Sequence, residues 1–268
     1  MKPLLIVALS AVAVYGALLI ALYLAQRALL FPAPPTRDYV SPQRLGMTFA
    51  REVPLSTTDG ETVMTWRMDA AEGRPTILYF HGNADSLVNF ADLMQHWHNL
   101  GFGASFVTYR GYPGSTGRPS EQAIIADAKL AYDALVNDGI SPDDIIVAGY
   151  SLGSAVAVAL AGEREARGLY LLAAISAADD IAKRSYPFLP VRELMRDPFR
   201  SVDRIGAVRA PVFLVHGAED RLAPLRDAER LYDAAPMPKR FLVVEDAGHI
   251  IPPDAGWDAF LDFLAKPP

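Results

Sequence analysis

One serine set between two glycines, in Gly149-Tyr150-Ser151-Leu152-Gly153, constrains the fold of this chain more than any other segment. The residues before it, Ile145–Ala148, are apolar and mostly β-branched, as in a buried strand. Residues 152–163 are rich in alanine and leucine and contain no proline, as in a helix. The pattern predicts a strand, a sharp turn at Ser151 and a helix. A Cβ atom at either glycine would crowd that turn, and the helix N-terminus favours a negatively charged oxygen beside Ser151. We interpret Ser151 as a nucleophile.

Apolar segments of strand length alternate with segments of helical periodicity over residues 50–266. The expected strands are 52–57, 62–68, 76–80, 104–109, 145–148, 168–174, 212–216 and 241–245. The expected helices are 84–100, 121–137, 152–163, 225–234 and 257–266. The first two strands meet at Asp59-Gly60, a hairpin signal. Such alternation predicts an α/β fold, with a mostly parallel central sheet and helices on both faces. Residues 176–209 interrupt it and contain three prolines, which indicates a short cap insert.

The N-terminus holds a second strong signal. Residues 4–25 are almost wholly apolar, which is about the ~20 residues that a helix needs to span a bilayer. A cleavable signal peptide is the alternative, but its apolar region is usually shorter, and Tyr23–Arg27 is a poor cleavage site. We therefore expect an uncleaved, single-pass N-terminal anchor. Positive charge flanks the anchor on both sides, so both orientations in the membrane stay open.

These signals divide the chain into three parts. Residues 1–27 are the transmembrane anchor, 28–49 a linker and 50–268 one α/β domain, a length that suits a large core. Within the linker, Phe31–Pro35 is proline-rich and is expected to be stiff. The net charge of −6 leaves no basic footprint for nucleic acid, and the absence of cysteine excludes disulfides, thiolate metal sites and a cysteine nucleophile.

Four patterns together resemble the α/β-hydrolase superfamily, and more closely its membrane-anchored branch of single-pass serine hydrolases with a short cap. They are His81-Gly82-Asn83, Tyr109–Ser115, the Ser151 turn and His216–Asp220. The cap segment Tyr186–Val191 is also similar to that branch. The resemblance implies the α/β-hydrolase fold and a catalytic triad in the order serine, acid, histidine.

Only one of the five histidines suits the role of the catalytic base. The others are His81, His96, His98 and His216. All four precede the last expected strand: two end strands in His-Gly pairs, and two share a helix upstream of the nucleophile. His249 follows the last strand, where a loop at the carboxyl end of the sheet would hold it over Ser151. The alternative is an exposed loop histidine.

The acid is expected at Asp220, because the resemblance places it at the aspartate of the His-Gly-x-x-Asp pattern, where it would orient the imidazole. Glu219 is adjacent and could compete. Asp220 could instead cap a helix ahead of Pro224. Asp179 and Asp180 are a less favoured position for the acid.

Acyl transfer also needs N–H donors for the oxyanion. The backbone N–H of Leu152, at the helix start, is one candidate, and the resemblance points to the amide of Asn83 as the other. His81 is then expected to hold the Asn83 loop in place. The glycine-rich segment 109–117 lacks the lysine of a phosphate-binding loop and is read as a tight loop beside the pocket.

The expected activity is cleavage of a carboxylic ester or thioester through an acyl-enzyme. No cofactor is expected, and no metal, because His96 and His98 are two residues apart on a helix. The expected partners are a small-molecule or lipid-like acyl substrate, or an acylated protein, and the membrane through the N-terminal helix. Two alternatives stay open: a peptidase or amidase with the same triad, and a non-catalytic scaffold with this fold.

Overall fold

Eight strands form one sheet in the order β1-β2-β4-β3-β5-β6-β7-β8 in a computed structural model that describes residues 2–32 and 38–266. The strands are β1 (Ala50–Ser56), β2 (Thr62–Met68), β3 (Thr76–Phe80), β4 (Gly103–Val107), β5 (Ile145–Tyr150), β6 (Gly168–Leu172), β7 (Val212–Gly217) and β8 (Lys239–Val244). β2 pairs antiparallel with both β1 and β4, and every other neighbouring pair is parallel. The predicted, mostly parallel sheet with an initial hairpin is therefore confirmed.

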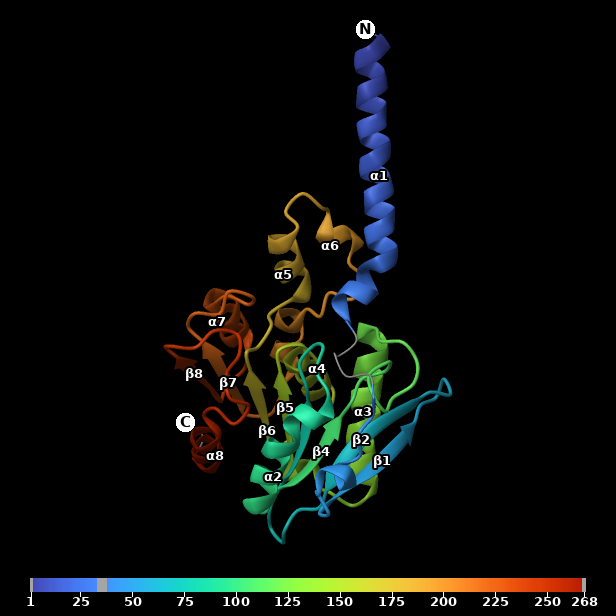
Figure 1. Cartoon of the computed structure of the whole chain (residues 1–268). Helices are drawn as coiled ribbons and strands as arrows, with labels where there is room; N and C mark the ends of the chain where they lie inside the picture. The colour runs from blue at the N-terminus through green and yellow to red at the C-terminus, as the bar shows by residue number, and fades with distance from the viewer. Residues whose placement is uncertain (1, 33–37, 267–268) are drawn as a thin grey trace.

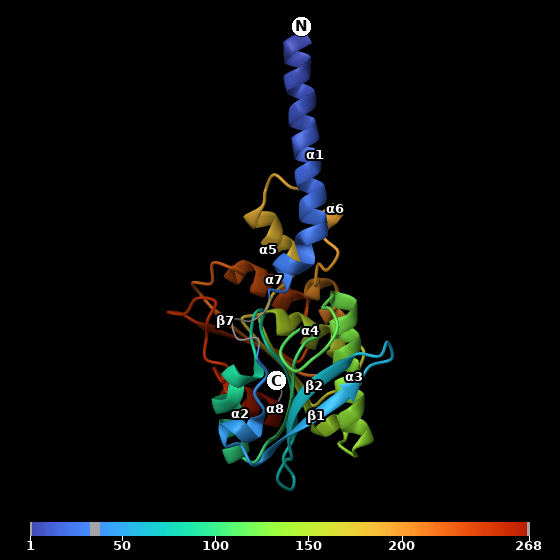
Figure 2. The same cartoon turned by 45° about the vertical axis from the view of Figure 1, so that its right-hand side comes forward.

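Helices cover both faces of the sheet, as the strand–helix alternation predicts (Figure 1). The long helices are α1 (Lys2–Leu30), α2 (Ala91–Asn99), α3 (Glu121–Asn137), α4 (Leu152–Ala161), α5 (Ala178–Ser185), α7 (Leu225–Ala234) and α8 (Trp257–Ala265). The core on one face includes side chains of α3, α4 and α7, and the core on the other face includes side chains of α2 and α8. Figure 2 shows α2 and α8 on one side of the sheet and α3 on the other. Parallel strands buried on both faces explain why their sequences are almost continuously apolar.

The prediction of a helix over residues 84–100 is wrong for residues 84–90. A 3₁₀ turn occupies Leu87–Phe90, and α2 begins only at Ala91. The carboxylate of Asp85 accepts hydrogen bonds from the backbone N–H of Ser86 (3.0 Å) and from the side chain of Asn89. Such local side-chain bonds compete with the helix, which explains the delayed start.

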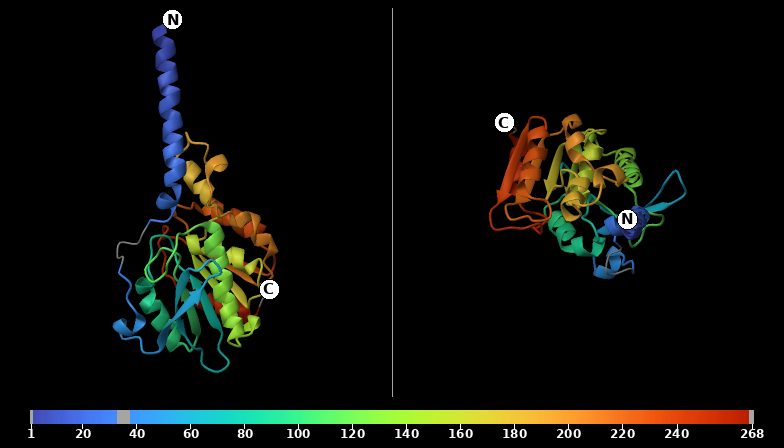
Figure 3. Two further views of the ribbon diagram at one scale, coloured as in Figure 1. Left: turned by 90° about the vertical axis from the view of Figure 1, so that its right-hand side faces the viewer. Right: turned by 90° about the horizontal axis from the view of Figure 1, so that it is seen from above.

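The N-terminal helix α1 projects from the domain, and its axis points away from the sheet (Figures 1 and 3). It continues to Leu30, three residues beyond the predicted anchor, because Ala28, Leu29 and Leu30 favour helix and the first proline after them is Pro32. Residues 33–35 of the expected stiff segment lie outside the described residues.

Residues 176–209, predicted as a cap insert and called the cap below, lie beside the C-terminal end of α1. They contain α5, the single-turn helix α6 (Val191–Leu194) and two 3₁₀ turns. Arg27 binds the buried carboxylate of Asp197 through two hydrogen bonds of 2.7 and 3.1 Å. Gln26 donates to the carbonyl of Leu194 and accepts from the N–H of Arg196. These contacts attach α1 to the cap.

Candidate active site

The strand-to-helix turn holds Ser151 in a strained backbone conformation. Its φ is 51° and its ψ is −115°, in a region that residues with a Cβ rarely adopt, at a cost of about 1–3 kcal/mol. The hydrogen bond from its N–H to the carbonyl of Leu172 (2.9 Å) helps to hold the turn. A Cβ at Gly149 would collide with the carbonyl of Gly153, and a Cβ at Gly153 with that of Phe80. Both glycines are thus required by close backbone packing, as the sequence predicts.

Three predicted site residues meet at the carboxyl edge of the sheet. Ser151 follows β5, Asp220 follows β7 and His249 follows β8. Ser151 Oγ lies 2.8 Å from His249 Nε2, and His249 Nδ1 lies 2.7 Å from Asp220 Oδ2. A carboxylate only accepts hydrogen bonds, so Nδ1 carries the imidazole proton and Nε2 is left to accept from the serine hydroxyl. The three side chains form one continuous hydrogen-bonded series.

The environment of Asp220 keeps its carboxylate ionised. Burial raises the pKa of Asp220, but hydrogen bonds from His249 and from the N–H of Ala223 outweigh it, and the pKa lies below its ordinary value. Its second oxygen accepts from the N–H groups of Leu222 and Ala223, both at 2.9 Å. Asp220 therefore caps a turn and contacts His249 at the same time. Helix α7 itself begins later, with Pro224 at its N-cap.

The other acidic candidates lie in different surroundings. Glu219 is exposed. Asp179 binds Arg200 at 2.6 Å, and Asp180 binds Arg192 at 2.7 Å within the cap. These pairs hold the cap together, so the geometry favours Asp220 as the partner of the imidazole.

The two other buried histidines have local structural contacts. Burial lowers the pKa of both His81 and His216, which keeps them neutral at pH 7. His81 Nδ1 bonds to the carbonyl of Gly82 at 2.7 Å, and His216 Nε2 bonds to the carbonyl of Ala223 at 2.8 Å. Each holds the backbone of a loop that carries a site residue.

The loop with the proposed second oxyanion donor lies directly against the nucleophile. A Cβ placed on Gly82 would be 3.6 Å from the Cβ of Ser151, so the backbone that leads into Asn83 passes beside the serine. Leu152 is the first residue of α4, and N–H groups in the first turn of a helix have no intrahelical acceptor. Both segments that carry the expected oxyanion donors therefore lie beside Ser151.

Two contacts that hold these loops were not foreseen from the sequence. The hydroxyl of Tyr150 donates to the carbonyl of His249 (2.9 Å) and accepts from the N–H of Ile251 (3.3 Å). The side chain of Asn83 accepts from the hydroxyl of Tyr112 (2.8 Å) and donates to the carbonyl of Leu30 in α1 (2.6 Å). The position of Tyr150 beside the serine was the available signal for the first contact; no local pattern indicates the second.

Two other sequence features, the histidine pair and the glycine-rich loop, make structural contacts in the described part of the chain. His98 stacks on Phe49, with ring centroids 4.0 Å apart, and no group of three histidine or carboxylate side chains is close enough to bind a metal within residues 2–32 and 38–266. The loop 109–117 packs on β2, where Ser115 and Thr116 accept backbone N–H groups. It is a tight loop, as expected.

Comparisons with known proteins agree with this architecture. The family described as serine aminopeptidase, S33, matches residues 71–196. The chain is 35% identical over 267 residues to the uncharacterized protein Rv2307c of Mycobacterium tuberculosis, a match that covers 97% of this chain and 93% of that protein. It is 32% identical over 189 residues to human alpha/beta hydrolase domain-containing protein 17C, covering 67% of this chain and 54% of the human protein.

Solved structures share the fold at low sequence identity. Esterase Pf2001 of Pyrococcus furiosus superimposes with a TM-score of 0.66 at 18% identity, over 88% of this chain and 97% of that one. Acetyl xylan esterase from Paenibacillus sp. R4 superimposes with a TM-score of 0.66 at 17% identity, over 81% of this chain and 83% of the esterase. At these identities the likeness concerns the fold alone.

Proposed function

The chain belongs to the α/β-hydrolase superfamily, and we propose that it is a membrane-anchored serine hydrolase that cleaves carboxylic ester or thioester bonds through an acyl-enzyme. The observation that carries the proposal is the continuous series from Ser151 Oγ through the His249 imidazole to the Asp220 carboxylate, with contacts of 2.8 and 2.7 Å. A serine hydroxyl is a weak nucleophile until a neighbouring base removes its proton, and this series provides that base.

The reaction follows from these contacts. Ser151 Oγ attacks the acyl carbon while its proton passes to His249 Nε2, and Asp220 stabilises the imidazolium that results. The N–H groups of Leu152 and Asn83 receive the oxyanion, at a stabilisation of about 3–4 kcal/mol per donor. The imidazolium then protonates the leaving alcohol or thiol, and the carbon–oxygen or carbon–sulfur bond breaks.

Hydrolysis of the acyl-enzyme uses the same groups in reverse. A water molecule gives one proton to His249 Nε2 and attacks the acyl carbon, and the proton returns to Ser151 Oγ as the carboxylic acid leaves. The side chain of His249 is 20% exposed, so water reaches the imidazole from the surface.

Retention of α1 as a membrane anchor is part of the proposal. The helix segment Pro3–Leu30 is long and apolar enough to cross a bilayer. Removal of this helix as a signal peptide would take away Arg27, whose guanidinium neutralises the buried carboxylate of Asp197. A buried charge that loses its partner is costly, so the domain is more stable with α1 attached.

Amide hydrolysis is the second candidate, because the matching family is described as a serine aminopeptidase. Purified full-length protein should therefore be assayed with an ester, a thioester and an amide of one acyl group, with Ser151→Ala as the blank. The proposal expects the ester and the thioester to be cleaved and the amide to be slow. Faster cleavage of the amide would favour the peptidase, and no cleavage of any substrate by folded protein would favour the scaffold.

A further inference from the structure

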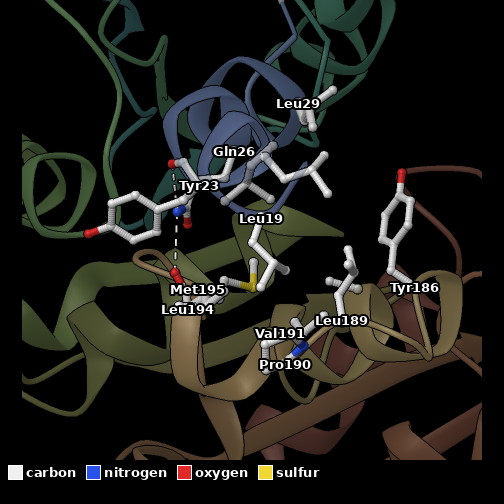
Figure 4. Close-up of a pocket in the computed structure, with 13 residues that line it drawn as sticks. Leu19, Tyr23, Gln26, Leu29, Tyr186, Leu189, Pro190, Val191, Leu194 and Met195 are labelled. Carbon is white, nitrogen blue, oxygen red and sulfur yellow. Dashed lines mark hydrogen bonds between the residues drawn. The ribbon is translucent and has the colours of Figure 1, made fainter. Parts of the chain in front are cut away.

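An apolar groove lies between the C-terminal half of α1 and the cap (Figure 4). Its volume is about 210 Å³. Most of the side chains that line it are aliphatic, among them Leu19, Leu22 and Leu30 of α1 and Leu189, Val191 and Leu194 of the cap. We call this space the anchor–cap groove. Such a lining offers few polar groups that could bind water. A hydrocarbon chain that enters the groove either leaves water, which is favourable, or leaves the apolar interior of the bilayer for another apolar environment.

The cap reaches far along α1. The hydroxyl of Tyr15 donates to the carbonyl of Phe188, 2.8 Å away, so the tip of the cap lies beside the middle of the helix. Tyr15 stands about 18 Å along the helix axis from Arg27, at a rise of 1.5 Å per residue. Figure 1 shows the α5–α6 loop rising beside α1.

This contact fixes where the tip lies if α1 spans a membrane. The apolar segment long enough to cross a bilayer is Pro3–Leu30. The part of it beyond Tyr15, residues 3–14, covers about 18 Å, whereas the hydrocarbon core of a bilayer is about 30 Å thick. A bilayer crossed by α1 must therefore extend past Tyr15 towards the domain, and the tip of the cap lies within it.

The composition of the cap tip suits that position. Residues 185–191 carry no charge, and Phe188 and Tyr186 are 87% and 52% exposed. Basic residues stand on both sides of this stretch: Lys183 and Arg184 before it, and Arg192 after it. Arg184 and Arg192 form ion pairs of 2.7 Å with Asp227 and Asp180, and Lys183 is exposed. An uncharged, aromatic stretch between basic residues is typical of a segment that enters a bilayer while its flanks face the phosphate groups.

The inner end of the groove lies next to the candidate active site. Leu30 lines the groove, and its carbonyl accepts the hydrogen bond from the side chain of Asn83. Asn83 is the residue proposed to supply an oxyanion donor. A chain that lies in the groove thus has one end towards the bilayer and the other beside the loop that flanks Ser151.

We propose that the anchor–cap groove binds an acyl chain of a phospholipid taken directly from the bilayer, and so presents a lipid ester to Ser151. This inference rests on the proposed function, since it names the substrate class of the same site. The groove selects for the hydrocarbon chain, and the exposed Lys183 beside the cap tip attracts the phosphate group.

Photocrosslinking tests the binding without any need for activity. The full chain is placed in phosphatidylcholine bilayers that contain a phosphatidylcholine with a photoactivatable acyl chain, and adducts are mapped by mass spectrometry. We expect adducts on groove residues, and we expect Leu19→Trp to reduce them because the indole fills the groove. The control is Leu18→Trp, the same change one residue away, at a side chain that is 48% exposed and does not line the groove. Adducts spread evenly around α1, or equal in all three proteins, would overturn the proposal.

Hydrolysis separates the groove from the catalytic chemistry. We expect Leu19→Trp to lower cleavage of a bilayer phospholipid ester at least about tenfold, which is 1.4 kcal/mol, and to leave cleavage of a water-soluble acetate ester unchanged. A wild type that cleaves the acetate ester but neither binds nor cleaves phospholipid would overturn this proposal and leave the proposed function standing. Groove adducts without cleavage of either ester would support lipid binding and count against the proposed function.

The absence of native cysteine allows a direct test of depth. A spin label is attached to Phe188→Cys and, as the aqueous reference, to Glu72→Cys in the exposed turn before β3. In bilayers we expect the label at position 188 to be relaxed by oxygen and protected from a water-soluble nickel complex, with the opposite result at position 72. Equal access of the nickel complex to both labels would show that the tip stays in water, contrary to the proposal.

Discussion

Replacement of Asp220 by asparagine removes one negative charge from the site and preserves the shape of the side chain. One oxygen of Asp220 accepts two backbone N–H groups, and the asparagine carbonyl can keep both bonds. The other oxygen, which lies 2.7 Å from His249 Nδ1, becomes an NH₂ group that donates. Two donors cannot face each other, so the imidazole adopts the tautomer with its proton on Nε2. Nε2 then cannot accept the proton of Ser151.

The size of the effect follows from this tautomer change. Loss of a correctly oriented base in a serine triad lowers kcat by about 10⁴-fold, which corresponds to about 5 kcal/mol of transition-state stabilisation. We therefore expect Asp220→Asn to reduce kcat/KM for a short-chain ester by roughly 10³–10⁴-fold. The melting temperature should change little, because the two backbone hydrogen bonds remain.

The neighbouring acid provides a matched control. Glu219→Gln removes the same charge one residue away, at an exposed side chain, and should leave kcat/KM within about twofold of the wild type. Both variants are assayed with a soluble ester in detergent, and their melting is followed by circular dichroism. If Asp220→Asn retained activity while Glu219→Gln lost it, the assignment of the acid would be wrong.

Three further predictions concern packing, the anchor and pH. Gly153→Ala should destabilise the domain by about 1–3 kcal/mol or more, because the added Cβ would collide with a backbone carbonyl of β3. Gly162→Ala is the control and should be tolerated, since the nearest atom to its added Cβ is 3.5 Å away. Thermal melting compares the two variants. Arg27→Ala should lower the free energy of unfolding in detergent by about 1–3 kcal/mol, since the carboxylate of Asp197 then stays buried without its cation. The double variant Arg27→Ala, Asp197→Asn should recover part of that loss, because it removes the unpaired charge. Burial lowers the pKa of His81, so below about pH 6.5 the unfolded chain binds a proton there that the native protein does not. Stability should therefore fall as the pH drops from about 7.5 to 5, by at most about 1.4 kcal/mol per pH unit from this residue, and His81→Asn should show a shallower fall in urea titrations.

The elements that local patterns specify are the ones that the sequence predicts well. The strand before Ser151, the turn and the helix after it follow from hydrophobic periodicity and from glycines that close packing requires. The start of α2 was missed, because the side chain of Asp85 stabilises a turn there. The start of the helix depends on which local hydrogen bonds the Asp85 side chain forms, and hydrophobic periodicity carries no information about those bonds.

The candidate site also has parts that the sequence predicts and contacts that it does not. The order of the strands brings the loops with Ser151, Asp220 and His249 to one edge of the sheet, so their proximity is predictable from topology. The bond from Tyr150 to the His249 carbonyl depends on the direction of one side chain. The contact between Arg27 and Asp197 joins residues 170 positions apart, and nothing in either local sequence indicates its partner.

The central claim is that Ser151 is an activated nucleophile, and covalent labelling tests it most directly. Full-length protein in detergent is treated with a fluorophosphonate probe beside Ser151→Ala and His249→Ala, and the modified peptide is identified by mass spectrometry. The account predicts a phosphonate on Ser151 in the wild type and loss of labelling in both variants. Folded wild-type protein that stays unlabelled, or a label on a different residue, would contradict it.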